Sequence, residues 1–180
     1  MKQEEQMNPH PIIIPAIAGD GTLYPVEKLK AHVDGLFHLA ISIFVFDGEH
    51  LLIQKRASSK YHCGGLWANT CCSHPYWDEP IDRCARRRLW EELGFNVPLS
   101  RRRVVEYSAD VGDGLHEHEK VTMYIGSADR TSVEILPDPL EVEDTRWITR
   151  DELHAEIARK PEDFTPWFRI YAERYPDLVF

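Results

Sequence analysis

Residues 73–95 read SHPYWDEPIDRCARRRLWEELGF and carry the clearest indication of the fold. A helix is predicted to begin near residues 78–80, where acidic side chains and a first-turn proline favour a helix N-terminus, and to end at Gly94. Apolar side chains recur every four residues along it, at Ile81, Ala85, Leu89 and Leu93. These four should therefore face the core.

The segment directly before this helix, residues 66–74, reads LWANTCCSH. On an extended strand Cys72 and His74 share one face, so a thiol acid or base could stand beside a metal ligand, while Cys71 should point away. The pair alone is weak evidence. A free cysteine is usually a small buried hydrophobe, and a lone histidine is usually a surface or hydrogen-bonded core residue.

The run from Ser73 onward resembles the Nudix box, Gly-x5-Glu-x7-Arg-Glu-U-x-Glu-Glu-x-Gly-U, in which U is aliphatic. Matching positions are Glu79, Arg87, Glu91, Glu92 and Gly94. Ser73 stands for the first glycine, and Arg88 replaces a glutamate by which Nudix hydrolases hold catalytic metal. The resemblance implies an α/β Nudix-like fold with a mixed central β-sheet flanked by helices. The missing glutamate argues against ordinary diphosphate hydrolysis.

A more specific resemblance covers most of the chain, from about Lys28 to Trp167. The sequence is similar to the type I isopentenyl diphosphate isomerases, a branch of the Nudix fold. The matching pieces are AH at 31–32, FHLA at 37–40, RASSK at 56–60, LWAN at 66–69, TCCSHP at 70–75, EHE at 117–119 and FTPW at 164–167.

Composition sets the broad class. The chain has 180 residues, 43% of them hydrophobic and 28% charged, which indicates one soluble globular domain. We expect an N-terminal arm over residues 1–20 that is partly ordered, followed by one catalytic domain over residues 21–180. A net charge of −9 disfavours binding to nucleic acid or to an anionic membrane surface.

The four cysteines lie at positions 63, 71, 72 and 84, and neighbouring Cys71 and Cys72 cannot easily pair with each other. No secretory or membrane-spanning stretch is recognisable. The cysteines are therefore interpreted as reduced thiols, which indicates a cytoplasmic enzyme. A monomer is compatible with the sequence.

Other elements follow from local patterns. Residues 39–46 and 51–55 are predicted to form a hairpin around Asp47-Gly48. Further strands are expected over 101–110, 117–127 and 143–148. Thr149 with Glu152 has the spacing of a capping box, and Thr165-Pro166 should open a last helix with Trp167 in its first turn.

Glu117 and Glu119 should point to the same side of their strand, with His118 on the other. Two such acids usually lie on a solvated face. The isomerase resemblance instead implies one divalent ion, Mn, Zn or Mg, with the ligands His32, His38, His74, Glu117 and Glu119. His32 and His38 are six residues apart where the family can have seven, which leaves the approach of His32 open. His62, His116 and His118 are interpreted as ordinary surface histidines.

The resemblance also implies a diphosphate site. Lys28, Arg56, Lys60 and Arg88 would contact the diphosphate, and Glu92 would hold a Mg ion with it. Basic residues on loops are more often solubilising groups, and Arg88 with Glu92 could be a simple ion pair between positions i and i+4. Trp167 would line the isoprenoid pocket, where its ring could stabilise a carbocation.

The predicted function is the isomerisation of isopentenyl diphosphate to dimethylallyl diphosphate by a 1,3 proton shift. The resemblance assigns the two proton-handling roles to Cys72 and Glu119, with Tyr107 assisting proton delivery. One alternative is a Nudix hydrolase of a nucleoside or other diphosphate. A noncatalytic, zinc-stabilised binding module is a third interpretation.

Overall fold

Strand β3 (His38–Asp47) is the branch point of the sheet. The computed structural model describes residues 11–179. Along one edge β3 pairs in parallel with β8 (Leu115–Ser127). Along its other edge it pairs antiparallel with β1 (Ile13–Ile17), β6 (Cys71–Ser73) and β4 (His50–Arg56) in turn.

Four further strands complete the sheet in the described part of the chain. β2 (Leu23–Glu27) pairs with β1, β5 (Trp67–Ala68) and β9 (Val142–Thr149) pair with β4, and β7 (Ser100–Gly112) pairs with β8. Because β3 and β8 run parallel while the other pairs are antiparallel, the sheet is mixed. This confirms the predicted α/β class.

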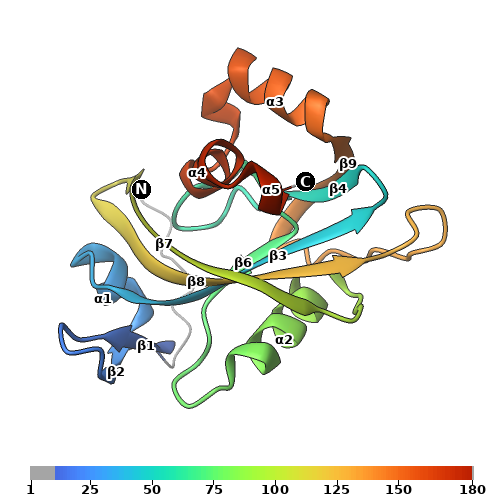
Figure 1. Cartoon of the computed structure of the whole chain (residues 1–180). Coiled ribbons are helices and arrows are strands. Elements are labelled where there is room, and N and C mark those ends of the chain that lie inside the picture. Colours follow the sequence, from blue (N-terminus) through green and yellow to red (C-terminus); the bar gives the residue numbers. More distant parts are fainter. Residues whose placement is uncertain (1–10, 180) are drawn as a thin grey trace.

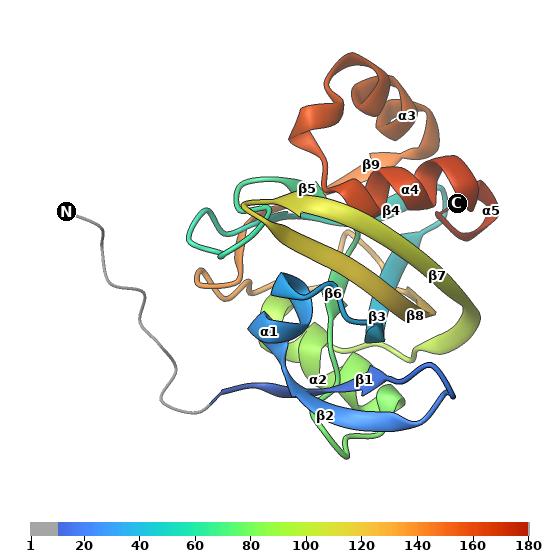
Figure 2. The same ribbon diagram turned by 90° about the vertical axis from the view of Figure 1, so that its left-hand side faces the viewer.

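The two faces of the sheet follow from the alternation of side chains along β3. Ile41, Ile43 and Val45 pack on one face with helix α2 (Ile81–Leu93). Ala40 and Phe44 pack on the other face, with helices α3 (Arg150–Arg159) and α4 (Pro166–Arg174). Figures 1 and 2 show the sheet between α2 on one side and α3 and α4 on the other. The α4 face also carries the candidate site.

Helix α2 agrees with its sequence prediction. Ala85, Leu89 and Leu93 are fully buried, and the helix ends at Gly94, whose φ of 70° is left-handed. A Cβ at Gly94 would lie 2.6 Å from the carbonyl oxygen of Leu136. Both the backbone conformation and the close approach therefore require glycine at this helix end.

The predicted hairpin of β3 and β4 is present, as are the predicted strands β7, β8 and β9, each slightly longer than expected. Thr149 and Glu152 form the predicted capping box at the start of α3. Thr165 occupies the N-cap position of α4 without a side-chain capping hydrogen bond, and a short 3₁₀ helix (Pro161–Asp163) and α5 (Pro176–Val179) flank that helix.

The N-terminal region contributes to the sheet within the described residues. The expected arm over residues 1–20 falls partly outside them, and its described part includes the strand β1. Helix α1 (Lys28–Val33) follows β2 and buries Ala31 and His32. Between residues 11 and 179, no helix has the length and apolar character needed to cross a membrane.

Candidate active site

A row of polar side chains crosses the sheet at one level. His38 on β3 is the register partner of Glu119 on β8, and Glu119 is the register partner of Tyr107 on β7. Register partners share a face of a sheet, so all three side chains point toward α4. The Tyr107 hydroxyl donates to Glu119 Oε2 at 2.7 Å and also contacts Glu117. Because a phenol has one proton, Tyr107 can donate to only one carboxylate at a time.

Three histidines meet beside this row. The ring centroid of His32 lies 5.0 Å from that of His38 and 5.2 Å from that of His74. His74 Nε2 lies 2.8 Å from Glu119 Oε1 and 3.2 Å from His38 Nε2. The four residues are buried, and one ligand atom from each lies within 4.8 Å of the others. The six-residue spacing of His32 and His38 thus does not keep them apart.

The backbone orients two of these rings for metal binding. Nδ1 of His32 lies 2.7 Å from the Lys28 carbonyl oxygen, and Nδ1 of His38 lies 2.7 Å from that of Leu36. Each Nδ1–H must then be the donor, and Nε2 of each ring faces the cluster. His32 Nε2 is buried without a hydrogen-bond partner among the described residues. A buried nitrogen without a hydrogen-bond partner, close to ligand atoms of His38, His74 and Glu119, fits a site for a divalent ion.

The ionisation of the cluster also suits a cation ligand set. Burial lowers the pKa of His32 to about 4, and burial and the charge of Lys28 hold the pKa of His74 well below its usual value. Burial alone would raise the pKa of Glu119, but its hydrogen bond with His38 lowers it. Burial would lower the pKa of His38, but its pairing with Glu119 raises it. A bound cation would displace a proton from His38 Nε2, because neutral imidazoles and an ionised carboxylate are the forms that bind metal.

Glu117 lies beside this group of four, in a second group with His32 and His62. His62 Nε2 lies 3.0 Å from Glu117 Oε1, and only 6% of His62 is exposed. The interpretation of His62 as a surface histidine is therefore wrong. It lies on a loop with no periodic pattern, so the sequence carried no signal of its burial. His116 and His118 are exposed, as expected.

Cys72 lies on the same face of the sheet as His38. Its register partner on β3 is Ser42, and its sulfur donates to Asn69 Oδ1 at 2.8 Å. The indole Nε1–H of Trp167 donates to the same sulfur at 3.2 Å. Burial raises the pKa of the Cys72 thiol to about 12, so the sulfur keeps its proton at neutral pH. Cys71 packs into the α2 face, as its strand position predicts.

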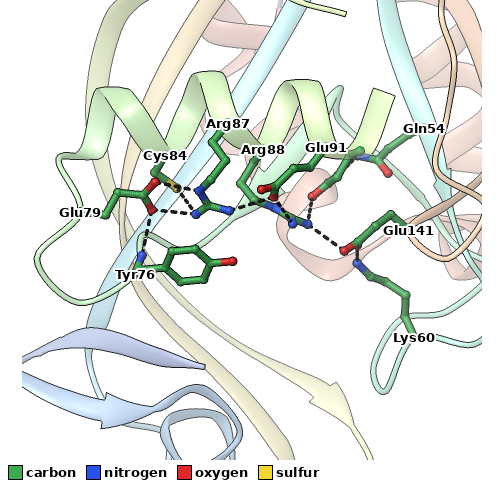
Figure 3. A network of polar contacts seen from close by, with 10 residues as sticks. Gln54, Lys60, Tyr76, Glu79, Cys84, Arg87, Arg88, Glu91 and Glu141 are labelled. Carbon is green, nitrogen blue, oxygen red and sulfur yellow. Dashed lines mark hydrogen bonds and ion pairs between the residues drawn. The ribbon is translucent and has the colours of Figure 1, made fainter. Parts of the chain in front are cut away.

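Four cations line the same pocket, namely Lys28, Arg56, Lys60 and Arg88. Burial and the charges of Lys60 and Arg88 lower the pKa of Lys28 to about 8. Arg88 donates to Glu92 Oε1 at 2.7 Å and to Glu91 at 2.8 Å. Figure 3 shows this network, which continues through Arg88 to Glu141 and Lys60.

The pocket itself is small, with a volume of about 40 Å³. Cys72, His74, Tyr107, Glu117, Glu119 and Trp167 line it together with the four cations. The guanidinium carbon of Arg56 lies 5.2 Å from the centre of the Trp167 ring. Of the predicted site residues, His32, His38 and Glu92 lie just behind the wall, where they contact the lining residues. All of the predicted site residues therefore converge on one region of the fold.

Comparison with known proteins identifies this fold. Residues 36–168 match the model of the NUDIX domain family. A MutT protein from Methanosarcina mazei superposes with a TM-score of 0.63 at 13% identity, over 78% of this chain and 94% of that one. A MutT NUDIX hydrolase from Burkholderia pseudomallei gives a TM-score of 0.56 at 24% identity, over 77% and 98% of the two chains. The chain belongs to the NUDIX domain family.

Within that family the similarity is much higher to one group. An isopentenyl-diphosphate Delta-isomerase of Rhodobacter capsulatus is 52% identical over 162 residues, which is 89% of this chain and 92% of that protein. The isopentenyl-diphosphate Delta-isomerase of Dinoroseobacter shibae is 50% identical over 163 residues, with 89% and 92% coverage. The chain therefore falls in the isopentenyl-diphosphate Delta-isomerase branch.

Proposed function

We propose that this protein isomerises isopentenyl diphosphate to dimethylallyl diphosphate. The observation that carries the proposal is that a protonated thiol and an ionised carboxylate line one small pocket that four cations also line. The names of the relatives at about 50% identity support the same reaction. Arg88, at a position where Nudix hydrolases have a metal-binding glutamate, disfavours hydrolysis.

The reaction needs two proton-handling groups. A proton must reach the terminal methylene carbon of the alkene, which gives a tertiary carbocation, and a second proton must leave the neighbouring methylene carbon. We assign these roles to Cys72 and Glu119. Cys72 lies on β6 and Glu119 on β8, strands that pair with opposite edges of β3, so the two groups approach the pocket from different directions. Tyr107, hydrogen-bonded to Glu119, would pass a proton between the two carboxylates.

The carbocation must be shielded from water. Trp167 is 2% exposed and lies directly against the Cys72 sulfur, so its ring would form the wall next to the reacting carbons. An indole face attracts a cation, and a desolvated pocket strengthens that attraction. Arg56 now lies over this ring, so we expect its guanidinium to shift toward the diphosphate when substrate binds.

The ligand set fits one divalent ion. We assign it to His32, His38, His74 and Glu119, with Glu117 adjacent, and Mn, Zn or Mg are all acceptable to such nitrogen and oxygen donors. When bound, the ion would supply positive charge that stabilises the ionised form of the Glu119 carboxylate. Lys28, Arg56, Lys60 and Arg88 would bind the substrate diphosphate, and Glu92 would hold the Mg ion that accompanies it.

The proposal is tested by incubation with isopentenyl diphosphate in heavy water. Dimethylallyl diphosphate carrying deuterium, with the diphosphate intact, is the expected product. Release of inorganic phosphate or pyrophosphate as the main product would instead favour the alternative Nudix hydrolase. An unchanged substrate pool with bound metal would favour the noncatalytic module.

A further inference from the structure

We propose that Glu141 is a positioning residue that holds two of the diphosphate-binding cations, Lys60 and Arg88, in place. The inference rests on the proposed function, because it assigns these cations to the substrate diphosphate. Glu141 has no role in the site predicted from the sequence. It lies next to the start of β9, about 50 residues or more from either cation along the chain.

The side chain of Glu141 bridges the loop after β4 and helix α2. One carboxylate oxygen, Oε2, pairs with Lys60 Nζ on the loop after β4, and the other, Oε1, lies 3.0 Å from an Arg88 nitrogen on α2. Figure 3 shows the carboxylate between the two cations. A single carboxylate therefore fixes the distance between a loop cation and a helix cation.

The backbone of Glu141 makes this bridge rigid. Its carbonyl oxygen accepts from the Ala57 amide at 3.0 Å, three residues before Lys60, and its own amide donates to the Asp138 carbonyl at 2.9 Å. Asp138 in turn donates its amide to the Glu92 carbonyl at 3.0 Å, at the end of α2. The main chain around Glu141 is thus tied to both of the elements that its side chain connects.

The charges explain why such a bridge is useful. Lys28, Arg56, Lys60 and Arg88 line one small pocket, and four like charges at close range repel one another. Burial would raise the pKa of Glu141, but the charges of Lys60 and Arg88 lower it to about 2, so the carboxylate stays ionised between them. An ammonium group has three N–H donors, so Lys60 keeps two for phosphate oxygens while one contacts Glu141.

Glu143 supplies a matched control. It lies two residues further along, carries the same side chain, and pairs with Lys55 at 2.9 Å and with the Ser58 hydroxyl at 2.6 Å. Its side chain is 40% exposed, against 24% for Glu141. None of these partners lines the pocket. Loss of its charge therefore tests any general effect of removing a carboxylate near this loop.

The experiment measures binding of magnesium pyrophosphate by calorimetry and steady-state isomerase kinetics in Glu141→Gln, Glu141→Asp and Glu143→Gln. We expect Glu141→Gln to weaken pyrophosphate binding about tenfold or more and to raise KM similarly, with kcat changed less than about threefold. Glu141→Asp keeps the charge but is too short to reach both cations, so its loss should be intermediate. Glu143→Gln should bind like the parent.

A folded Glu141→Gln variant that binds pyrophosphate as tightly as the parent would overturn the inference, because the bridge would then not be needed. Tighter binding would overturn it as well, because Glu141 would then compete with the diphosphate. An equal loss in Glu143→Gln would overturn it too. If Glu141→Gln does not fold, Glu141→Asp decides, and parent-level binding in that variant would contradict the bridge. A parent protein that binds magnesium pyrophosphate but does not isomerise would reject the proposed function and leave the inference standing.

Discussion

Adjacent cysteines in β6 have opposite surroundings. Cys71 is fully buried against α2 in an apolar cluster, whereas Cys72 lies in the pocket between Asn69 and Trp167. A strand forces this difference, because neighbouring side chains point to opposite faces. The pair therefore offers a comparison in which one thiol is in the site and the next is in the core.

The first prediction uses that comparison. Cys72→Ala should lower isomerase turnover by about 10² to 10⁴, the usual cost of removing a positioned acid or base. Cys72→Ser should recover little, because a hydroxyl is a much weaker acid than a thiol. Cys71→Ala should keep near-normal turnover with a modest loss of stability from the small cavity it leaves. Turnover is compared after circular dichroism has shown that each variant is folded. Near-normal turnover in Cys72→Ala would reject the mechanism.

The second prediction concerns His62, which contacts one carboxylate oxygen of Glu117 while Tyr107 contacts the other. Residues that orient ligand side chains typically contribute about 10- to 100-fold to metal affinity. His62→Ala should therefore weaken binding of the divalent ion by about that factor, measured by competition with a metal-sensitive dye. His118→Ala, an exposed histidine against Phe37, is the control and should bind metal normally. Unchanged affinity in His62→Ala would show that Glu117 needs no such support.

Among the elements, those with local signals were predictable and those that depend on register were not. The periodic apolar residues of α2, the Asp47-Gly48 turn and the Thr149 capping box each lie within a short stretch, and all three are present. The parallel pairing of His38 with Glu119 joins residues about 80 positions apart, and no local pattern encodes it. The convergence of the site residues was therefore implied only by resemblance, and His62 and Glu141, which no matched motif identified, were missed.

The third prediction tests the end of α2. Gly94→Ala should lower the free energy of unfolding by roughly 1 to 3 kcal/mol, because alanine must adopt a left-handed φ and its Cβ would approach the Leu136 carbonyl. Gly48→Ala is the control. Gly48 also has a positive φ of 55°, but a Cβ there would meet no atom within 4 Å. Gly48→Ala should therefore lower the free energy of unfolding only by the cost of placing alanine at a positive φ, about 1 kcal/mol. Denaturant titration measures both, and equal losses would mean that the contact with Leu136 is unimportant.

The site is built beside three apolar clusters, one on each face of the sheet and a third between β1, β2 and α1. The metal ligands lie at one end of β3, outside the apolar cluster that packs with α2. The fold should therefore persist without an ion, although several buried imidazoles would lose their partner.

The fourth prediction follows from this arrangement. Treatment with a chelator should abolish turnover and lower the melting temperature by several degrees, because an ion that binds only the folded state stabilises it by mass action. The far-ultraviolet circular dichroism spectrum should stay unchanged. His74→Ala should give a folded protein with little bound metal. Complete unfolding on chelation would instead indicate a structural metal, as a binding module would have.

The small size of the pocket has a kinetic consequence. Its volume of about 40 Å³ compares with the roughly 300 Å³ or more of typical small-molecule sites, so the walls must part before a substrate can enter. Arg56, Lys60, Tyr61 and His62 come from one short segment that Glu141 ties to α2, whereas Trp167 comes from α4, so we expect opening to displace α4 from this segment. Association should then be gated. Its observed rate should reach a plateau at high substrate concentration, at the frequency with which the pocket opens.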